Sequence, residues 1–459
     1  DGKNPDVSIL SGNTENFDST IVGVSGAAFG NVEAMVVVNR YYGDANLAVN
    51  ASTINAHYLT LKAYQDHFID QTSVTVSGAI GTIQANVLAN FIGDYVEPGE
   101  TEDSYWDNED LKGIGSEVNG YVDEYGSASS ESNPGILGSL LTAGEDYLSD
   151  TDKSLIIDSA ATATDAASTA AGTTVTVSGT KIQADTVSIT AEEDRASDAG
   201  IEMTVGGGEI GGATIAASVG TLRLNHNAHV TIAGSEIQTK AGGTIASLIG
   251  GHNQLDIYQA SVTLASGTAA YADAAINGQA QVQLNHSTLT TQSDNSALHV
   301  TGKNESNNVV NGIGIIAGGI TGGGIVGDLR DTSSVLVDAV GGDLYGNIAL
   351  EGIRAQSLTA TAAVGQAGVI NGAGGLARIH DSGSVRITVD GVTHGGIAGE
   401  AGDGQESVTE SDFTVKANDE TQSFAHSFGV SASVISNVGV AQATIDKTGS
   451  TDVTIKGST

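Results

Sequence analysis

The chain has 459 residues, with 54 acidic and 17 basic side chains, so its formal net charge at pH 7 is −37. This charge excludes tight binding of a nucleic-acid backbone through ion pairs, and an anionic membrane surface would repel the chain. The absence of Cys excludes disulfides, zinc–thiolate sites, iron–sulfur clusters and cysteine nucleophiles.

Apolar residues make up 39% of the chain although aromatic residues make up only 4%. An ordered core is therefore predicted, built from Ala, Val, Ile and Leu rather than from large rings. The most apolar run, GIGIIAGGITGGGIVG from Gly312 to Gly327, is shorter than a membrane-spanning helix and half of it is Gly. It predicts a buried strand, and we expect no membrane insertion.

The first part of the chain predicts strands. Residues 1–22 contain two short apolar stretches in a polar setting, either a strand donated to a neighbouring chain or the first strand of this chain's own sheet. Residues 23–93 alternate apolar and polar side chains between Gly, Asn, Asp and Ser, as strands separated by turns do.

Internal similarity supports a repeat. Asn50–Ala63 (NASTINAHYLTLKA) aligns with Ser178–Ala191 (SGTKIQADTVSITA), with the same Ile-x-Ala followed by alternating apolar residues. Weaker copies place anchor residues at Ile237, Val262 and Leu289, which are 25 and 27 residues apart. A repeat of 20–30 residues is typical of a β-solenoid, in which each coil of the chain stacks on the previous one.

Residues 94–171 interrupt the pattern, and we expect an acidic insertion with short helices. Seven of its carboxylates are candidate calcium ligands, because calcium prefers several oxygen ligands and close carboxylates repel without a cation: Glu97, Glu100, Glu102, Asp103, Asp107, Glu109 and Asp110. A solvated acidic loop is the alternative. Its aromatic residues are candidate contacts for a ligand, since such rings are large and rigid: Tyr95, Tyr105, Trp106, Tyr121 and Tyr125.

Residues 172–459 predict the main stack of coils. No Pro occurs after Pro134, as expected for a continuous ladder in which every Pro would remove a hydrogen bond. Asn225, Asn227 and Asn285 follow apolar alternation and predict corners, with stacked amides. His226 and His286 share the context Leu-Asn-His, which predicts equivalent surface positions on two coils rather than a metal site.

The segment Gly30–Ala63 and the segments Ala217–Ala241 and Ala432–Gly457 resemble the repeats of filamentous-haemagglutinin-like and leukotoxin-like bacterial surface proteins. The resemblance covers roughly residues 23–89 and 173–457. It implies a right-handed parallel β-solenoid that is secreted to the cell surface and serves adhesion or assembly without catalytic residues.

Three functions follow as expectations. The first is a non-enzymatic structural solenoid, an adhesin or the subunit of an extracellular filament that self-associates by end-to-end β-stacking. The second is a module that binds a host glycan or protein through residues 94–171. The third is a carbohydrate-active β-helix, although no pair of carboxylates stands out for glycoside cleavage.

Overall fold

The structure is a computed structural model that describes residues 4–93, 171–292, 296–396, 398–400, 406–408 and 411–459. Every regular element in these residues is a β-strand. The described part of the chain therefore contains no helix long and apolar enough to cross a membrane. The candidate calcium ligands, the candidate aromatic contacts and the expected helices of residues 94–171 lie outside the described residues, apart from Ala171.

The strands form one large parallel sheet that closes on itself, plus the small antiparallel pair β18–β19. Such a closed parallel sheet is all-β and compatible with a solenoid. In chain order the strands are β1 (Val7–Gly26), β2 (Asn31–Tyr41), β3 (Asp44–Asn50), β4 (Thr53–Ile92), β5 (Ala171–Ser178), β6 (Lys181–Glu193), β7 (Gly200–Ala233), β8 (Glu236–Thr239), β9 (Gly243–Ile249), β10 (His252–Thr291), β11 (Leu298–Asn304), β12 (Asn307–Asp331), β13 (Ser334–Tyr345), β14 (Ile348–Arg354), β15 (Ser357–Asp381), β16 (Ser384–Asp390), β17 (Thr393–Gly395), β18 (Ala398–Glu400), β19 (Glu406–Val408), β20 (Phe413–Asp419), β21 (Gln422–Lys447) and β22 (Ser450–Lys456).

The pairing register defines seven successive coils, each being one circuit of the chain. The same position in these coils is occupied in turn by Val7, Leu59, Val187, Gly243, Leu298, Ile348 and Phe413. From Val187 to Ile348 the steps are 56, 55 and 50 residues, and parallel strands bring neighbouring coils to about 4.8 Å. The predicted repeat of 20–30 residues is therefore wrong: one coil contains about two such lengths.

The anchor residues show why the repeat of 20–30 residues in the sequence does not equal the length of one coil. Ile54, Ile182, Ile237 and Leu289 do stack on one another in four successive coils. Val262 does not belong to this column, because it lies on the outer surface of β10 and is 58% exposed. Strands on the two sides of one coil share the same small and β-branched composition, so the sequence does not distinguish half a coil from a whole one.

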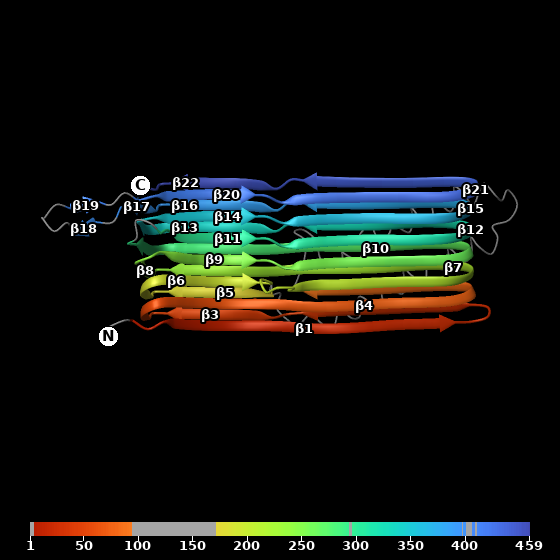
Figure 1. The fold of residues 1–459 in the computed structure, drawn as a ribbon, viewed down its shortest axis with the longest axis horizontal. Coiled ribbons are helices and arrows are strands. Elements are labelled where there is room, and N and C mark those ends of the chain that lie inside the picture. The colour runs from red at the N-terminus through yellow and green to blue at the C-terminus, as the bar shows by residue number, and fades with distance from the viewer. Residues whose placement is uncertain (1–3, 94–170, 293–295, 397, 401–405, 409–410) are drawn as a thin grey trace.

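Each coil has two parts, which Figure 1 shows side by side along the long axis of the molecule. The part we call the body packs one apolar core, which includes Leu61, Ile189 and Val337. The part we call the arm consists of an outgoing strand and a returning strand around a second core, which includes Met203, Leu255 and Leu329. Polar side chains fill the junction between the two cores, which we call the waist.

Two glycines are required by the close approach of successive coils. Gly200 and Gly243 both have a φ of 148°, a conformation that L side chains rarely adopt. A Cβ atom on Gly200 would lie 1.9 Å from the carbonyl oxygen of His252, and one on Gly243 would lie 2.2 Å from that of Val187. A side chain at either position would push neighbouring coils apart.

The stacked body core predicts a large cost for a single truncation. Ile189 is fully buried between Leu61 of the preceding coil and Ile245 of the following coil. Ile189→Ala should lower the free energy of unfolding in urea by about 2–5 kcal/mol, because it removes apolar contacts and leaves a cavity. The control Gln183→Ala, at an exposed position of the same strand, should change it by less than about 0.5 kcal/mol. Equal effects would contradict the stacked-core description.

Candidate functional site

Both ends of the stack carry open strand edges within the described residues. In the first coil, β1 and β2 pair only with β4, and β3 pairs only with β5. In the last coil, β20, β21 and β22 pair only with β14, β15 and β16. The outer backbone groups of these six strands are therefore available to another chain, which makes the two end coils the candidate assembly surfaces.

The two open ends correspond residue by residue in register, although their strands are divided differently. In the first coil, β1 is paired along its whole length, and we compare its stretches Val7–Asn13 and Asn16–Gly26 together with the whole of β2 and β3. Tracing the register upward places them on Phe413–Asp419, Gln422–Ala432, Asn437–Lys447 and β22 of the last coil. Each stretch and its counterpart have the same number of residues, so the ladder could continue from one copy to the next without a change of register.

The waist near the first coils contains a buried cluster of charged groups. Asp194 accepts hydrogen bonds at Oδ1 from the backbone N–H of His67 at 2.8 Å and from its Nδ1 at 2.9 Å. His226 Nδ1 lies 3.6 Å from the other Asp194 oxygen, and His67 Nε2 lies 3.9 Å from Glu15 Oε2. Glu193 is fully buried beside them, and neither of its oxygens has a hydrogen-bond partner among the described residues.

These contacts change the proton affinities of the cluster. Burial alone would lower the pKa of His67, but the Asp194 carboxylate, with Glu193 and Glu15, raises it to about 9. Burial would raise the pKa of Asp194, but His67 and His226 hold it below its usual range. Burial raises the pKa of Glu193 well above its usual range. His67 and Asp194 therefore form a buried ion pair at neutral pH.

The prediction for His226 and His286 is wrong. His226 is buried in the waist and stacks in register with Gly278, whereas His286 lies at a corner of the body with a φ of 48°. Their shared Leu-Asn-His context reflects two different junctions of the coil. The predicted stacking of amides occurs at Asn225, which accepts a hydrogen bond at 3.2 Å from Asn277 of the next coil. Asn285 instead stacks between Ala233 and Val340, so no amide ladder forms there.

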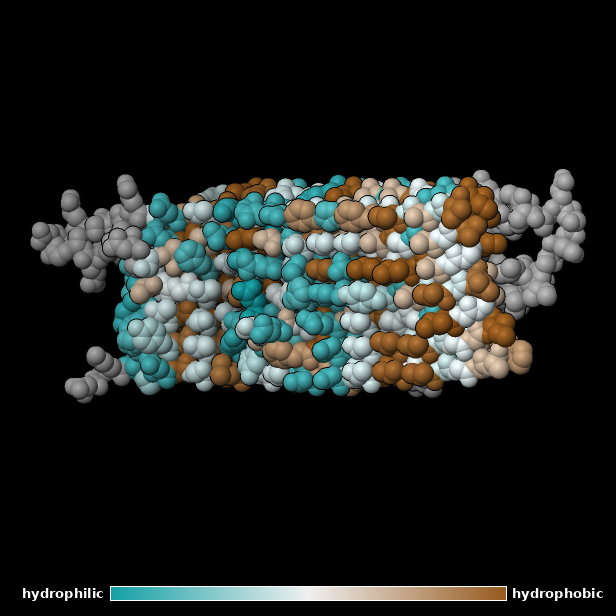
Figure 2. All heavy atoms as spheres, turned by 45° about the vertical axis from the view of Figure 1, so that its right-hand side comes forward, coloured by the Kyte–Doolittle hydropathy of each residue, from teal (hydrophilic) through white to brown (hydrophobic). Residues whose placement is uncertain are grey.

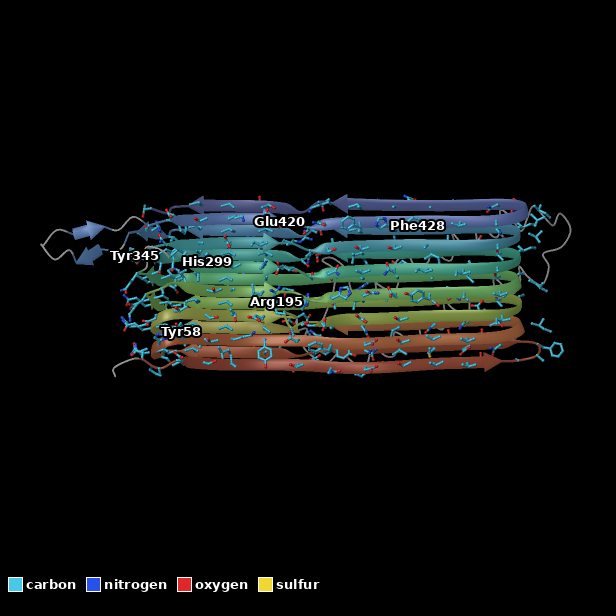
Figure 3. All side chains as sticks on the ribbon, in the orientation of Figure 1. Tyr58, Arg195, His299, Tyr345, Glu420 and Phe428 are labelled. Carbon is cyan, nitrogen blue, oxygen red and sulfur yellow. The ribbon has the colours of Figure 1, made fainter. Side chains whose placement is uncertain are left out.

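A second charged cluster lies in the waist near the last coils. Arg354 is fully buried and pairs with Asp331 at 3.3 Å, with Asp381, and with Asp419 at 3.3 Å. Lys447 lies 3.1 Å from Asp419 and 3.4 Å from Asp381. These residues come from three successive coils, so the cluster ties the coils together and presents Lys447, which is partly exposed, toward the open end. Figure 3 shows the waist region beside Arg195 and Glu420.

The arm also contains a buried carboxylate. Glu209 points into the lumen of the arm, where Gln259 Nε2 donates a hydrogen bond to its Oε1 at 3.2 Å and no described group hydrogen-bonds its Oε2. Burial raises the pKa of Glu209 to about 7, although hydrogen bonds from Thr214, Gln259 and Ser261 act in the opposite direction. The Glu209 carboxyl in the lumen of the arm is therefore partly protonated at neutral pH.

A shallow groove lies on the outer surface where the arm begins. Asp18, Asp70 and Glu202 stack in register along it, with Asp198 and His252 beside them. Within the described ranges, no group of three or more His, Asp or Glu side chains is placed to hold a metal ion. The groove is thus an exposed column of carboxylates, and the sequence did not single out any of its members.

No family model matches this chain, and neither a curated protein nor a solved structure shows significant similarity to it. The resemblance to haemagglutinin-like and leukotoxin-like surface proteins therefore stays a prediction from sequence.

The His67 cluster predicts a loss of stability at alkaline pH. The pKa of His67 is higher in the folded chain than its unfolded value near 6.5, so its contribution is complete below pH 6.5 and is lost as pH rises through about 9. Over that interval the free energy of unfolding should fall by about 3 kcal/mol more in the wild type than in His67→Gln. Urea titrations at pH 6 and pH 9.5 measure this difference. The control His299→Gln, at an exposed position of β11, should behave as the wild type does.

Glu209 predicts a separate effect at lower pH. Because its pKa is raised in the folded chain, the folded state binds the proton more tightly, and stability falls as pH rises from about 4.5 through 7. Glu209→Gln removes this pH dependence. Between pH 4 and pH 8, the free energy of unfolding of the variant should therefore rise by about 3 kcal/mol relative to that of the wild type. Glu202→Gln, at an exposed position of the same strand, is the control. A constant difference between wild type and Glu209→Gln would contradict the buried position of this carboxylate.

Proposed function

We propose that the chain is a parallel β-solenoid that serves as a non-enzymatic structural unit of an extracellular filament or adhesin and extends by end-to-end β-stacking. The observation that carries this proposal is that both ends present open strand edges whose residues correspond in register. A right-handed coil and location at a bacterial surface belong to the proposal through the family that the sequence resembles.

The contact between two such ends would repeat the contacts within one chain. Each coil already pairs with its neighbour along the whole circuit, at the spacing of ordinary parallel strands. A second copy would satisfy the open backbone groups of β20–β22 with those of β1–β3. A head-to-tail contact of this kind does not close on itself, so it produces a filament rather than a ring or a dimer.

Side chains at the two ends are compatible with the same joint. In the continued register, Phe413 and Val415 of one copy would cover Val7 and Ile9 of the next, which extends the body core across the joint. Lys447 would lie on Tyr41 of the next copy. Glu15, which raises the pKa of Tyr41 electrostatically, is close to that position. Opposite charges would then meet in the waist, although the chain as a whole is strongly acidic.

The other two expected functions stay predictions. A binding role for residues 94–171 depends on residues outside the described ranges. A carbohydrate-active site would need carboxylates about 5–10 Å apart on one surface. Asp18, Asp70 and Glu202 stack in register on successive coils, which lie about 4.8 Å apart. The test of such a site is release of reducing or unsaturated sugar from acidic polysaccharides, with Asp70→Asn as the matched variant.

The filament proposal is tested by placing charge inside the joint. Ser19→Glu with Ile21→Glu puts two carboxylates on lumen-facing positions of β1, where they are tolerated at an open end but would be buried in a stack. We expect the wild type to form fibres of uniform width in negative-stain electron microscopy, and this variant to form single short rods.

The matched control is Ser8→Glu with Thr20→Glu, which adds the same charge to exposed positions of the same strand. It should form fibres as the wild type does. Short rods from the wild type under all conditions, or equal loss of fibres in both variants, would contradict end-to-end stacking through the open edges.

A further inference from the structure

The outer surface of the arm is apolar near its far edge, and we call this surface the arm patch. It consists of outward side chains of the outgoing strands and of the turns that follow them, and Figure 2 shows it as brown spheres gathered toward the arm edge. It crosses all seven coils, and one exposed member from each, in order, is Val24, Ile80, Ile210, Leu264, Ile315, Val369 and Val434. Residues 312–327 do form a strand, as predicted. The strand is not buried on both sides, however, since Ile315 on its outer side is 63% exposed.

The arm patch coincides with a reversal of the usual alternation of side chains. In β10, Leu255 and Ile257 point into the lumen near the waist, but Gln259, Ser261 and Thr263 occupy the lumen farther out. Some of the polar groups inside pair with one another: Ser73 donates to Asn86 at 2.7 Å, and Ser218 donates to Gln259 at 2.6 Å. With polar groups facing the lumen and apolar groups outside, the far part of the arm is arranged for contact with another apolar surface.

The arm patch is also uncharged in a chain of net charge −37. In register, the far parts of the arm are residues 21–37, 73–88, 205–220, 257–272, 312–327, 362–377 and 427–443. They contain two formally charged residues, Glu33 and Glu209. The Glu33 carboxylate accepts a hydrogen bond from the Ser25 hydroxyl, and the Glu209 carboxylate points into the lumen. Two copies of this acidic chain repel each other over most orientations, and this edge lets them meet with their charged groups far apart.

We propose that the arm patch is a lateral interface with the arm patch of a second copy of this chain. Two identical patches have the same row spacing, so the outward rows of one copy can lie between or opposite those of the other along all seven coils. An isologous contact about a two-fold axis satisfies this requirement for either relative direction of the two stacks. A strongly acidic partner or an anionic lipid surface would be repelled by the rest of the chain.

The lateral interface goes beyond end-to-end stacking and does not depend on it. If filaments also form, stacking copies end to end would make the arm patch continuous along the fibre, and lateral pairing would then join two fibres into a ribbon. If they do not form, the same interface would give a dimer. The two interfaces can therefore be tested one at a time, in a chain whose ends are blocked by Ser19→Glu and Ile21→Glu.

The first experiment uses the absence of native Cys. Leu264 is 76% exposed in the fourth of the seven coils, and a two-fold contact in either direction brings the central coils of the two copies together. In the end-blocked chain, Leu264→Cys should give a disulfide-linked dimer under mild oxidation. Val340→Cys, at an exposed position of the body, should give at most a few per cent. Equal cross-linking of both variants, or none at Leu264→Cys, would overturn the proposal.

The second experiment measures the association itself. Sedimentation velocity of the end-blocked chain should show a dimer, and Ile210→Thr with Val262→Thr and Leu264→Thr should raise its dissociation constant at least about 100-fold. Thr keeps strand propensity, so far-UV circular dichroism and the melting temperature should stay near those of the end-blocked parent. Tyr58→Ser with Val340→Thr is the control for exposed apolar residues outside the arm patch.

Two results would overturn the lateral interface. One is an end-blocked chain that sediments as a monomer at every concentration, and the other is a triple variant that dimerises as its parent does. Flotation of the monomeric chain with phosphatidylcholine vesicles, lost in the triple variant, would assign the arm patch to lipid instead. Loss of fibres with lateral dimers retained would contradict only the end-to-end proposal, so the two failures are distinguishable.

Discussion

The continuous parallel backbone ladder is the constraint on which the rest of this structure depends. Each described coil pairs with its neighbours along almost its whole circuit, so the paired stretches must keep one register at a spacing of about 4.8 Å, and differences in coil length fall between these stretches. Side chains that point inward must therefore stack on residues of similar size. Leu61, Ile189 and Ile245 satisfy this rule in the body. Gly243, between Val187 and Leu298, is an exception, because its backbone leaves no room for a Cβ atom.

The same ladder explains why charge is confined to particular places. A buried charge in a stack is surrounded by the coils above and below, so it requires partners from those coils. Arg354 meets aspartates from three coils, and Asp194 meets His67 from the preceding coil and His226 from its own. These clusters sit in the waist, between two apolar cores. The far part of the arm reduces the problem, because its lumen holds mostly neutral polar groups and burial raises the pKa of Glu209 to about 7.

The two proposed interfaces use the two kinds of surface that such a stack leaves open. The ends offer unpaired backbone and continue the ladder, whereas the arm edge offers uncharged apolar side chains. The carboxylates on the body and in the groove make copies of this acidic chain repel one another, but copies can still associate through surfaces that carry no charge. Together the two surfaces would allow growth in length and in width to be set by different residues.

Composition and periodicity were sufficient to determine much about this protein. Scarce Pro, abundant small residues and the alignment of Asn50–Ala63 with Ser178–Ala191 predicted parallel stacked strands, and Ile54 and Ile182 do stack. Only the tertiary structure decided the length of a coil, because the two sides of one circuit have the same composition and Val262 imitates an anchor residue. It alone placed His226 in the waist, and Ile313, Ile315 and Ile320 on the outer surface while Ile316 and Ile325 are buried. Alternation specifies two faces of a strand, but which face is the lumen depends on contacts with strands about 50 residues away.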